Sequence, residues 1–314
     1  MLETLVPDHR KLVADELGIG VKAKAETSHA SSAPDAPNIP PDHPRVQEII
    51  RQAKARGGVI LSGPPGTSKS FYAAAAALVL AGTATRCRFV QFHASYQYED
   101  FMVGFTPTET GFDPKDGPFL DLVKKAILDE DEHPHVLVID ELSRADVGRV
   151  FGEAFTYIEG NKRRLPFTIA NGEEIKIPPN LYVIATMNPF DRGVDEVDAA
   201  FERRFAKIEM NPDPQILDEI LTDNEMDEVL KAEVIKWFRR INGHAQLNPA
   251  ASVGHAYFWD ASDVLTLTDL WEYQLKHLVS RAFRRDQNVG DDIREAWANI
   301  FKALPAEAEP ESQP

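Results

Sequence analysis

Hydrophobic positions along the chain form short continuous runs that alternate with stretches of helical spacing. The runs Gly58–Ser62, His135–Ile139 and Leu181–Thr186 have the continuous apolar character of strands that are buried on both faces of a parallel sheet. Shorter strands are predicted at Arg88–Phe92 and Phe205–Met210. The intervening segments with helical spacing are Val46–Lys54, Phe71–Leu80, Pro118–Asp129 and Val147–Glu159. This alternation predicts an α/β domain with a mainly parallel sheet.

Two further patterns complete the predicted organisation. Asn171-Gly172 separates the short stretches Leu165–Ala170 and Glu173–Ile177, which predicts a β-hairpin because both turn residues accept positive φ. From Pro214 to Leu304 the pattern is mainly helical. The predicted parts are a short helix with a Pro/Ser/Ala-rich linker (1–45), the α/β domain (46–212), a small all-α domain (213–304) and a disordered tail (305–314).

Composition and charge narrow the function classes. The 314 residues are 43% hydrophobic and 27% charged, and no apolar run reaches the roughly 18 residues that a membrane span needs. A single cysteine, Cys87, excludes an internal disulfide, and a cytoplasmic protein without membrane association is expected. The formal net charge of −16 argues against autonomous nucleic-acid binding over a broad surface.

A glycine-rich segment between the first strand and the following helix predicts a phosphate-binding loop. Backbone N–H groups of such a loop turn inward around a triphosphate, and the helix N-terminus adds its dipole. Lys69 is expected to contact the β and γ oxygens, and the Ser70 hydroxyl to bind Mg²⁺. Ser68 stands where the pattern has its last glycine. The expected nucleotide-binding residues are Gly63, Pro64, Pro65, Gly66, Thr67, Ser68, Lys69 and Ser70.

Two adjacent acids end the strand that begins at His135. Asp140 is expected to hold Mg²⁺ together with Ser70, and Glu141 to polarise an attacking water. A pair of acids after a strand is also typical of a helix N-cap, but the upstream phosphate loop favours the functional interpretation.

Polar residues after the next strands extend the candidate catalytic set. Asn188 directly follows the Leu181–Thr186 strand, and it would orient the attacking water if that strand lies beside the one ending in Asp140. Arg203 and Arg204 end a short predicted helix, and an arginine there can neutralise transition-state charge on a neighbouring subunit's nucleotide. The alternatives are an Asn-Pro turn and a solvated charged helix end.

The order of these motifs resembles an AAA+ ATPase module, and within that superfamily the McrB-like and MoxR-like, dynein-related group. The resemblance covers residues 46–304. It implies a P-loop NTPase parallel sheet flanked by helices, followed by the helical lid. Besides the loop and the paired acids, the stretches that carry it are Val90–Phe101, Asp140–Arg144, Ile177–Asn188 and Gly254–Phe258.

The resemblance also implies a homo-oligomeric, hexameric ring with nucleotide between subunits. Arg203 or Arg204 would then be the trans-acting finger and Asn188 the first sensor, while Arg144 would serve the subunit interface. ATP is the expected nucleotide, with Mg²⁺ as cofactor. McrB itself hydrolyses GTP, and Thr-Ala-Asp follows this Asn there, whereas this chain has Pro189-Phe190-Asp191. The choice between ATP and GTP therefore stays open. Only some 45 residues precede the module, too few for the N-terminal DNA-reading domain of McrB, so any DNA specificity is expected to come from a partner or from elsewhere.

Three functions remain open at this point. The leading one is the motor subunit of a DNA restriction or defence system, working with a separate nuclease and reaching DNA through the ring or a partner. The second is a MoxR-like remodelling chaperone that acts on a client protein. The third, suggested by Ser68, is a nucleotide-dependent scaffold without appreciable turnover.

Overall fold

The computed structural model describes residues 39–109, 111–129, 132–190 and 199–303. The predicted N-terminal helix and the predicted tail lie outside the described residues, as does Asp191.

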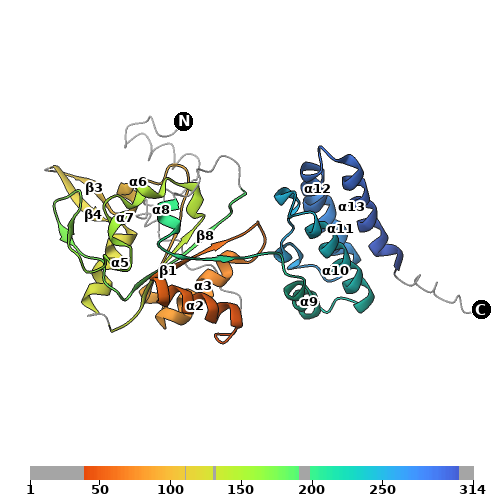
Figure 1. Ribbon diagram of the computed structural model, residues 1–314, viewed down its shortest axis with the longest axis horizontal. Helices are drawn as coiled ribbons and strands as arrows, with labels where there is room; N and C mark the ends of the chain where they lie inside the picture. Colours follow the sequence, from red (N-terminus) through yellow and green to blue (C-terminus); the bar gives the residue numbers. More distant parts are fainter. Residues whose placement is uncertain (1–38, 110, 130–131, 191–198, 304–314) are drawn as a thin grey trace, which may run out of the picture. The chain divides into compact units, whose positions relative to one another are not determined.

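A five-stranded parallel sheet forms the centre of the α/β part, in the order β2-β5-β8-β1-β9. Its strands β1 and β8 are labelled in Figure 1. Strand β1 lies between two strands that come far later in the chain, with Leu61 opposite Thr186 on one side and Ile208 on the other. The predicted strands are confirmed, and each end agrees to within one residue. Their bounds are β1 Gly58–Ser62, β2 Cys87–Gln91, β5 His135–Asp140, β8 Leu181–Met187 and β9 Ala206–Glu209.

Alternate strand residues point to opposite faces of this sheet. Both faces carry apolar side chains, and helices cover both of them. Val59, Val138 and Ile184 pack in one core with α2 (Pro44–Arg56) and α3 (Lys69–Ala81). Ile60, Leu137 and Val183 belong to a second core on the other face. That face is covered by α4 (Tyr98–Phe101), α5 (Pro118–Leu128), α6 (Val147–Phe151) and α7 (Ala154–Tyr157). The remaining short elements here are η1 (Ala84–Arg86), η2 (Leu142–Arg144) and α8 (Ala199–Glu202).

The prediction of one helix over Val147–Glu159 is wrong. Gly152, with φ 50° and ψ −127°, separates α6 from α7. A Cβ on Gly152 would lie 2.5 Å from the ring of Tyr98, so the break accommodates a side chain that the sequence pattern does not reveal.

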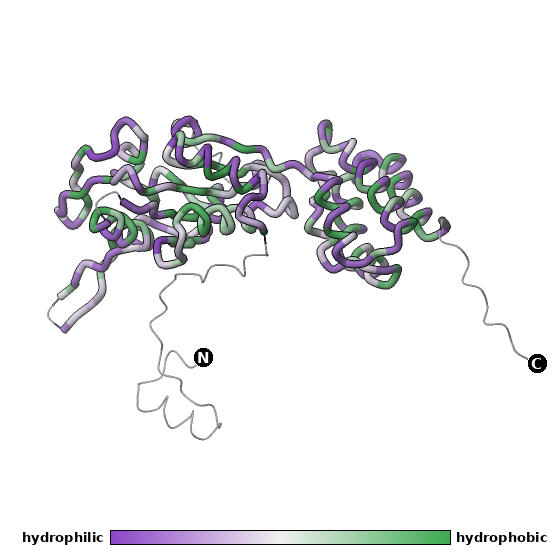
Figure 2. Tube along the Cα trace, turned by 90° about the horizontal axis from the view of Figure 1, so that it is seen from below, coloured by the Kyte–Doolittle hydropathy of each residue, from purple (hydrophilic) through white to green (hydrophobic). Residues whose placement is uncertain are grey.

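Two antiparallel hairpins accompany the sheet. The predicted one at Asn171-Gly172 is confirmed, but its strands β6 (Phe167–Thr168) and β7 (Glu174–Ile175) are shorter than expected. The other, β3 (Val103–Thr108) with β4 (Gly111–Asp116), has no sequence prediction and stands out in Figure 2. Of the aromatic residues near it, Tyr96 and Phe101 are buried in the core, whereas Phe105 is 54% exposed.

The helical part has a separate hydrophobic core in which Trp237 contacts Phe258 and Trp297. Among the described residues, no helix has the length and apolar character to cross a membrane. Its elements are α9 (Pro214–Asp223), α10 (Glu228–Gly243), η3 (Pro249–Ala251), η4 (His255–Phe258), α11 (Val264–Leu270), η5 (Trp271–Leu275), α12 (Lys276–Ala282), α13 (Gln287–Ile300) and η6 (Phe301–Ala303).

Candidate functional site

The glycine-rich loop leaves β1 at a point where the neighbouring strands fix its path. The Gly63 N–H donates to the Met187 carbonyl oxygen at 3.2 Å, which continues the pairing of β1 with β8. A Cβ at Gly63 would lie 2.1 Å from the Met210 carbonyl oxygen, so only glycine fits here without backbone movement. The start of the loop is therefore anchored to the carboxyl ends of β8 and β9.

Inside the loop, two side chains converge on one carbonyl oxygen. The Pro64 carbonyl accepts hydrogen bonds from the Thr67 hydroxyl at 2.9 Å and from Lys69 Nζ at 2.7 Å. Thr67 is fully buried, whereas Pro65 is exposed at the tip of the loop. The Lys69 ammonium thus lies within the curl of the loop, where the sequence predicts the phosphates of a nucleotide.

Ser68 immediately precedes α3 and has the left-handed conformation, with φ 58° and ψ 24°. An L-residue with a side chain costs about 1–2 kcal/mol in this conformation, whereas glycine does not. The geometry explains why the pattern has glycine at this position. Here the serine Oγ lies 3.1 Å from Nε2 of His255 in the helical part.

The predicted metal-binding pair is in contact. Ser70 Oγ donates to Asp140 Oδ1 at 2.8 Å, and Thr186 Oγ1 donates to the same oxygen. Mg²⁺ prefers hard oxygen ligands and is usually held by one or two carboxylates together with substrate phosphates. The hydroxyl and carboxylate oxygens beside the phosphate loop therefore fit a magnesium ion.

Glu141 follows Asp140 in the left-handed region, with φ 56°. Its backbone N–H donates to Thr186 Oγ1 at 3.3 Å, and its carboxylate pairs with Arg144 Nε at 3.4 Å. A non-glycine residue in this conformation is typical of functional sites, where the surroundings hold a strained backbone in place. Thr186 thus contacts both acids. The sequence analysis assigned it no role, although a polar residue within an apolar strand was a usable signal.

Asn188 lies one residue beyond β8, which is the direct neighbour of β5 in the sheet. This is the adjacency on which the sensor prediction depends. The Asn188 side chain is 7% exposed, and its Oδ1 accepts the Phe190 N–H at 3.1 Å in an Asx-type turn. The Asn-Pro turn is therefore compatible with the predicted role of Asn188 in orienting the attacking water.

The two arginines after α8 have different surroundings. Arg204 lies over the Phe155 ring, 4.5 Å from its centroid, and its Nε is 3.7 Å from a Glu159 carboxylate oxygen. Arg203 is exposed. Of the two, Arg203 is the one whose side chain reaches the surface, which a trans-acting finger requires.

A contact between the phosphate loop and the helical part was missed by the sequence analysis. The Ala256 N–H donates to the Gly66 carbonyl oxygen at 2.9 Å, and His255 Nδ1 accepts the Asp213 N–H at 3.4 Å. The Gly254–Phe258 stretch was noted only for its resemblance, and nothing in its spacing indicated a partner in the loop.

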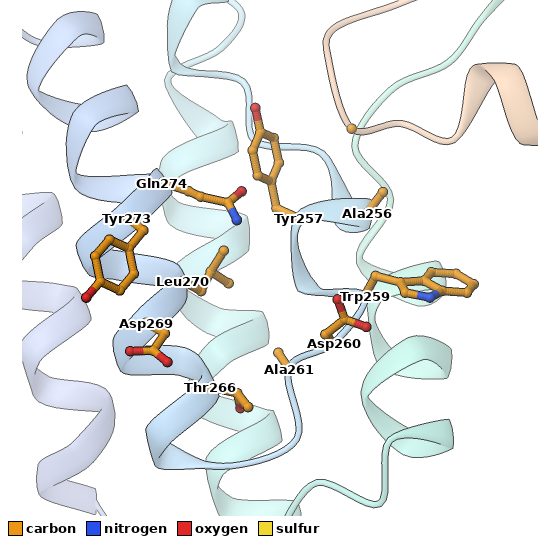
Figure 3. A pocket seen from close by; sticks show the side chains of 11 residues that line it. Ala256, Tyr257, Trp259, Asp260, Ala261, Thr266, Asp269, Leu270, Tyr273 and Gln274 are labelled. Carbon is orange, nitrogen blue, oxygen red and sulfur yellow. The ribbon is translucent and has the colours of Figure 1, made fainter. Parts of the chain in front are cut away.

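Beside this contact lies a cavity of about 570 Å³ that Gly66 also lines. Figure 3 shows Tyr257 of η4 on one side, together with Trp259 and Asp260, which directly follow η4, and residues of α11 and η5 on the other. Those on the second side are Thr266, Asp269, Leu270, Tyr273 and Gln274. The cavity therefore combines aromatic and carboxylate side chains next to the phosphate loop.

Comparison with known proteins accounts for this arrangement. Residues 58–205 match the family described as AAA domain (dynein-related subfamily). This segment is an AAA domain of the dynein-related subfamily. It contains the phosphate loop, the paired acids, Asn188 and both arginines, and the predicted α/β fold is confirmed.

Two curated relatives of this AAA protein are components of restriction enzymes. The chain is 34% identical over 228 residues to the type IV methyl-directed restriction enzyme EcoKMcrB subunit of Escherichia coli (strain K12). It is 34% identical over 128 residues to the type II restriction enzyme BsuMI component YdiS of Bacillus subtilis (strain 168). These matches cover 68% and 36% of this chain, but only 50% and 36% of the relatives. The chain thus spans at most half the length of these relatives.

A solved structure, the FIGL-1 AAA domain in complex with ADP, is 15% identical to the chain. The match covers 84% of this chain and 82% of that chain, with a TM-score of 0.38. That score is too low to show a shared arrangement of the two whole chains. The resemblance to an McrB-like AAA+ ATPase therefore rests on the family match and the two curated relatives.

Proposed function

We propose that this chain is a Mg²⁺-dependent nucleoside triphosphatase that forms a ring and serves as the motor subunit of a DNA restriction system. The hydrogen bond from Ser70 Oγ to Asp140 Oδ1 carries the enzymatic part of this proposal, because it joins the phosphate loop to the paired acids. The restriction system is inferred from the two relatives, and the McrB-type member of that pair covers more of the chain.

The residues divide into three tasks. Backbone N–H groups of the loop and the Lys69 ammonium bind and orient the triphosphate. Ser70 and Asp140 would hold Mg²⁺, which supplies charge neutralisation on the phosphate oxygens when bound. Glu141 would accept a proton from the attacking water, and Asn188 would orient that water.

A subunit interface completes the proposed site. Arg203 would approach the nucleotide of the next subunit, since it is exposed whereas Arg204 packs over Phe155. ATP is the proposed nucleotide and GTP the alternative. A nuclease subunit is the proposed partner, and the client-directed chaperone function stays an untested prediction.

The test is phosphate release with MgATP and MgGTP side by side over a titration of protein concentration. We expect turnover that rises more than linearly with protein concentration, because a trans-acting arginine needs a neighbouring subunit. The matched variants are Glu141→Gln, which keeps binding and loses most turnover, and Lys69→Ala, which loses binding.

Specific activity that is independent of protein concentration would contradict the ring. Normal turnover in Glu141→Gln would show that another residue activates the water. Nucleotide binding without turnover by either nucleotide would favour the scaffold hypothesis.

A further inference from the structure

Ser68 lies in the least favourable backbone conformation of the phosphate loop and yet carries a side chain there. Its φ of 58° belongs to the left-handed region, where glycine is the usual residue. The only hydrogen bond that the structure gives its hydroxyl, within the described residues, is the 3.1 Å contact with His255 Nε2. The serine therefore gains a specific partner that glycine cannot have.

The direction of this hydrogen bond follows from the other ring nitrogen. His255 Nδ1 accepts the backbone N–H of Asp213 at 3.4 Å, so Nδ1 carries no proton. Burial lowers the pKa of His255 to about 4, and the ring is neutral at pH 7. Its single proton is then on Nε2, which donates to Ser68 Oγ. The Ser68 hydroxyl can then donate its own proton to an acceptor that binds in the loop, such as a phosphate oxygen.

Close packing of the backbone around them keeps Ser68 and His255 in contact. A Cβ on Gly254 would lie 2.0 Å from the Gly66 carbonyl oxygen and 2.6 Å from that of Pro65. A Cβ on Gly66 would lie 2.9 Å from the Tyr257 ring. His255 is 1% exposed between these contacts. The helical part thus packs directly against the loop that is predicted to receive phosphate.

We propose that Ser68 and His255 form a latch in which His255 orients the Ser68 hydroxyl for phosphate binding and ties the phosphate loop to the helical part. The latch deepens the proposed function and rests on it, since the ligand is the triphosphate or diphosphate of the same nucleotide. His255 is a positioning residue, because it acts through Ser68 and touches no phosphate itself.

The test is the affinity for MgADP, measured by titration calorimetry on the full chain. Ser68→Ala removes the hydroxyl but keeps the left-handed conformation, and His255→Asn keeps an acceptor near the Nδ1 position but loses the donor at Nε2. We expect each to weaken binding about tenfold, and the double variant also about tenfold, because both changes remove one shared interaction. His255→Gln, whose amide nitrogen reaches the Nε2 position, should bind within twofold of the unmodified protein.

The possible outcomes distinguish failure of the latch from misfolding of a variant and from failure of the proposed function. A hundredfold loss in the double variant, or equal affinities for the Asn and Gln variants, would overturn the latch. If the Asn variant unfolds, Ser68→Gly replaces it, because it removes the hydroxyl without straining the left-handed backbone. We expect it to bind about tenfold more weakly than the unmodified protein, and an unchanged affinity would also overturn the latch. No MgADP binding by the unmodified chain, with Lys69→Ala as the negative control, would refute the proposed function itself.

Discussion

Thr186 is the residue whose replacement tests the arrangement of the paired acids most directly. Its hydroxyl donates to Asp140 Oδ1 and accepts the Glu141 N–H at 3.3 Å, and the residue is 2% exposed. Thr186→Val has nearly the same volume, so it removes these two hydrogen bonds without leaving a cavity.

The expected magnitude follows from the two bonds. A hydrogen bond to a carboxylate contributes about 1.5–3 kcal/mol, and the longer bond to the Glu141 N–H about 0.5–1 kcal/mol. Asp140 is only partly buried, so water recovers some of this loss. We expect a net loss of about 2 kcal/mol in the free energy of unfolding, and about tenfold slower hydrolysis because both acids lose their support.

Urea unfolding of the nucleotide-free protein and steady-state phosphate release measure these two quantities. With a urea slope of about 3 kcal/mol/M, the loss corresponds to a midpoint lowered by about 0.7 M. Thr186→Ser is the matched control, since it keeps the hydroxyl and should keep the hydrolysis rate. An unchanged midpoint together with hydrolysis within twofold in Thr186→Val would refute the reasoning.

Three further predictions concern other sites. Arg203→Ala should abolish most hydrolysis with unchanged stability, whereas Arg204→Ala should lower the urea midpoint; the reverse pattern would assign the finger to Arg204. Arg163 is partly buried and donates to the Gly57, Ile158 and Leu181 carbonyl oxygens. Arg163→Met should cost about 2–4 kcal/mol in urea unfolding, and a loss below 1 kcal/mol would contradict this. Burial lowers the pKa of His255 to about 4, although the charge of Asp213 partly opposes the shift. The folded protein should therefore lose about 2–3 kcal/mol of stability as pH falls from about 6.5 toward 4. His255→Gln should lack this part of the pH dependence.

Local signals were sufficient for the framework of the α/β part. Gly58–Ser62 contains the apolar run Val59–Leu61 and ends in the glycine-rich turn, so both ends of β1 were predictable. Asp140 and Asn188 were located because each follows a buried strand, and the parallel pairing of β5 with β8 brings these strand ends to one edge. The roles assigned to these residues are still predictions.

What the sequence could not show depends on contacts between distant segments. Gly152 breaks a helix because the Tyr98 ring occupies the space of its absent Cβ, and no local pattern reports that ring. Ser68 and His255 are 187 positions apart, and neither has a spacing that indicates the other. Arg163 donates to carbonyl oxygens of Gly57, Ile158 and Leu181, which lie in three separate segments, and no local pattern indicates these partners. The β3–β4 hairpin was missed because β4 is exposed throughout and carries no alternation of burial.

The strand order of the sheet has a consequence for synthesis of the chain on the ribosome. Strand β1 pairs only with β8 and β9, so its apolar residues have no strand neighbour until the chain has been made through Met187. At ordinary elongation rates this leaves β1 without a strand partner for roughly 10 s after it is translated. Val59, Ile60 and Leu61 are fully buried in the finished protein, and they would be accessible to a chaperone during that interval. The nascent phosphate loop gains its anchor to β8 and β9 only when the sheet closes, so nucleotide binding should be among the last properties that the growing chain acquires.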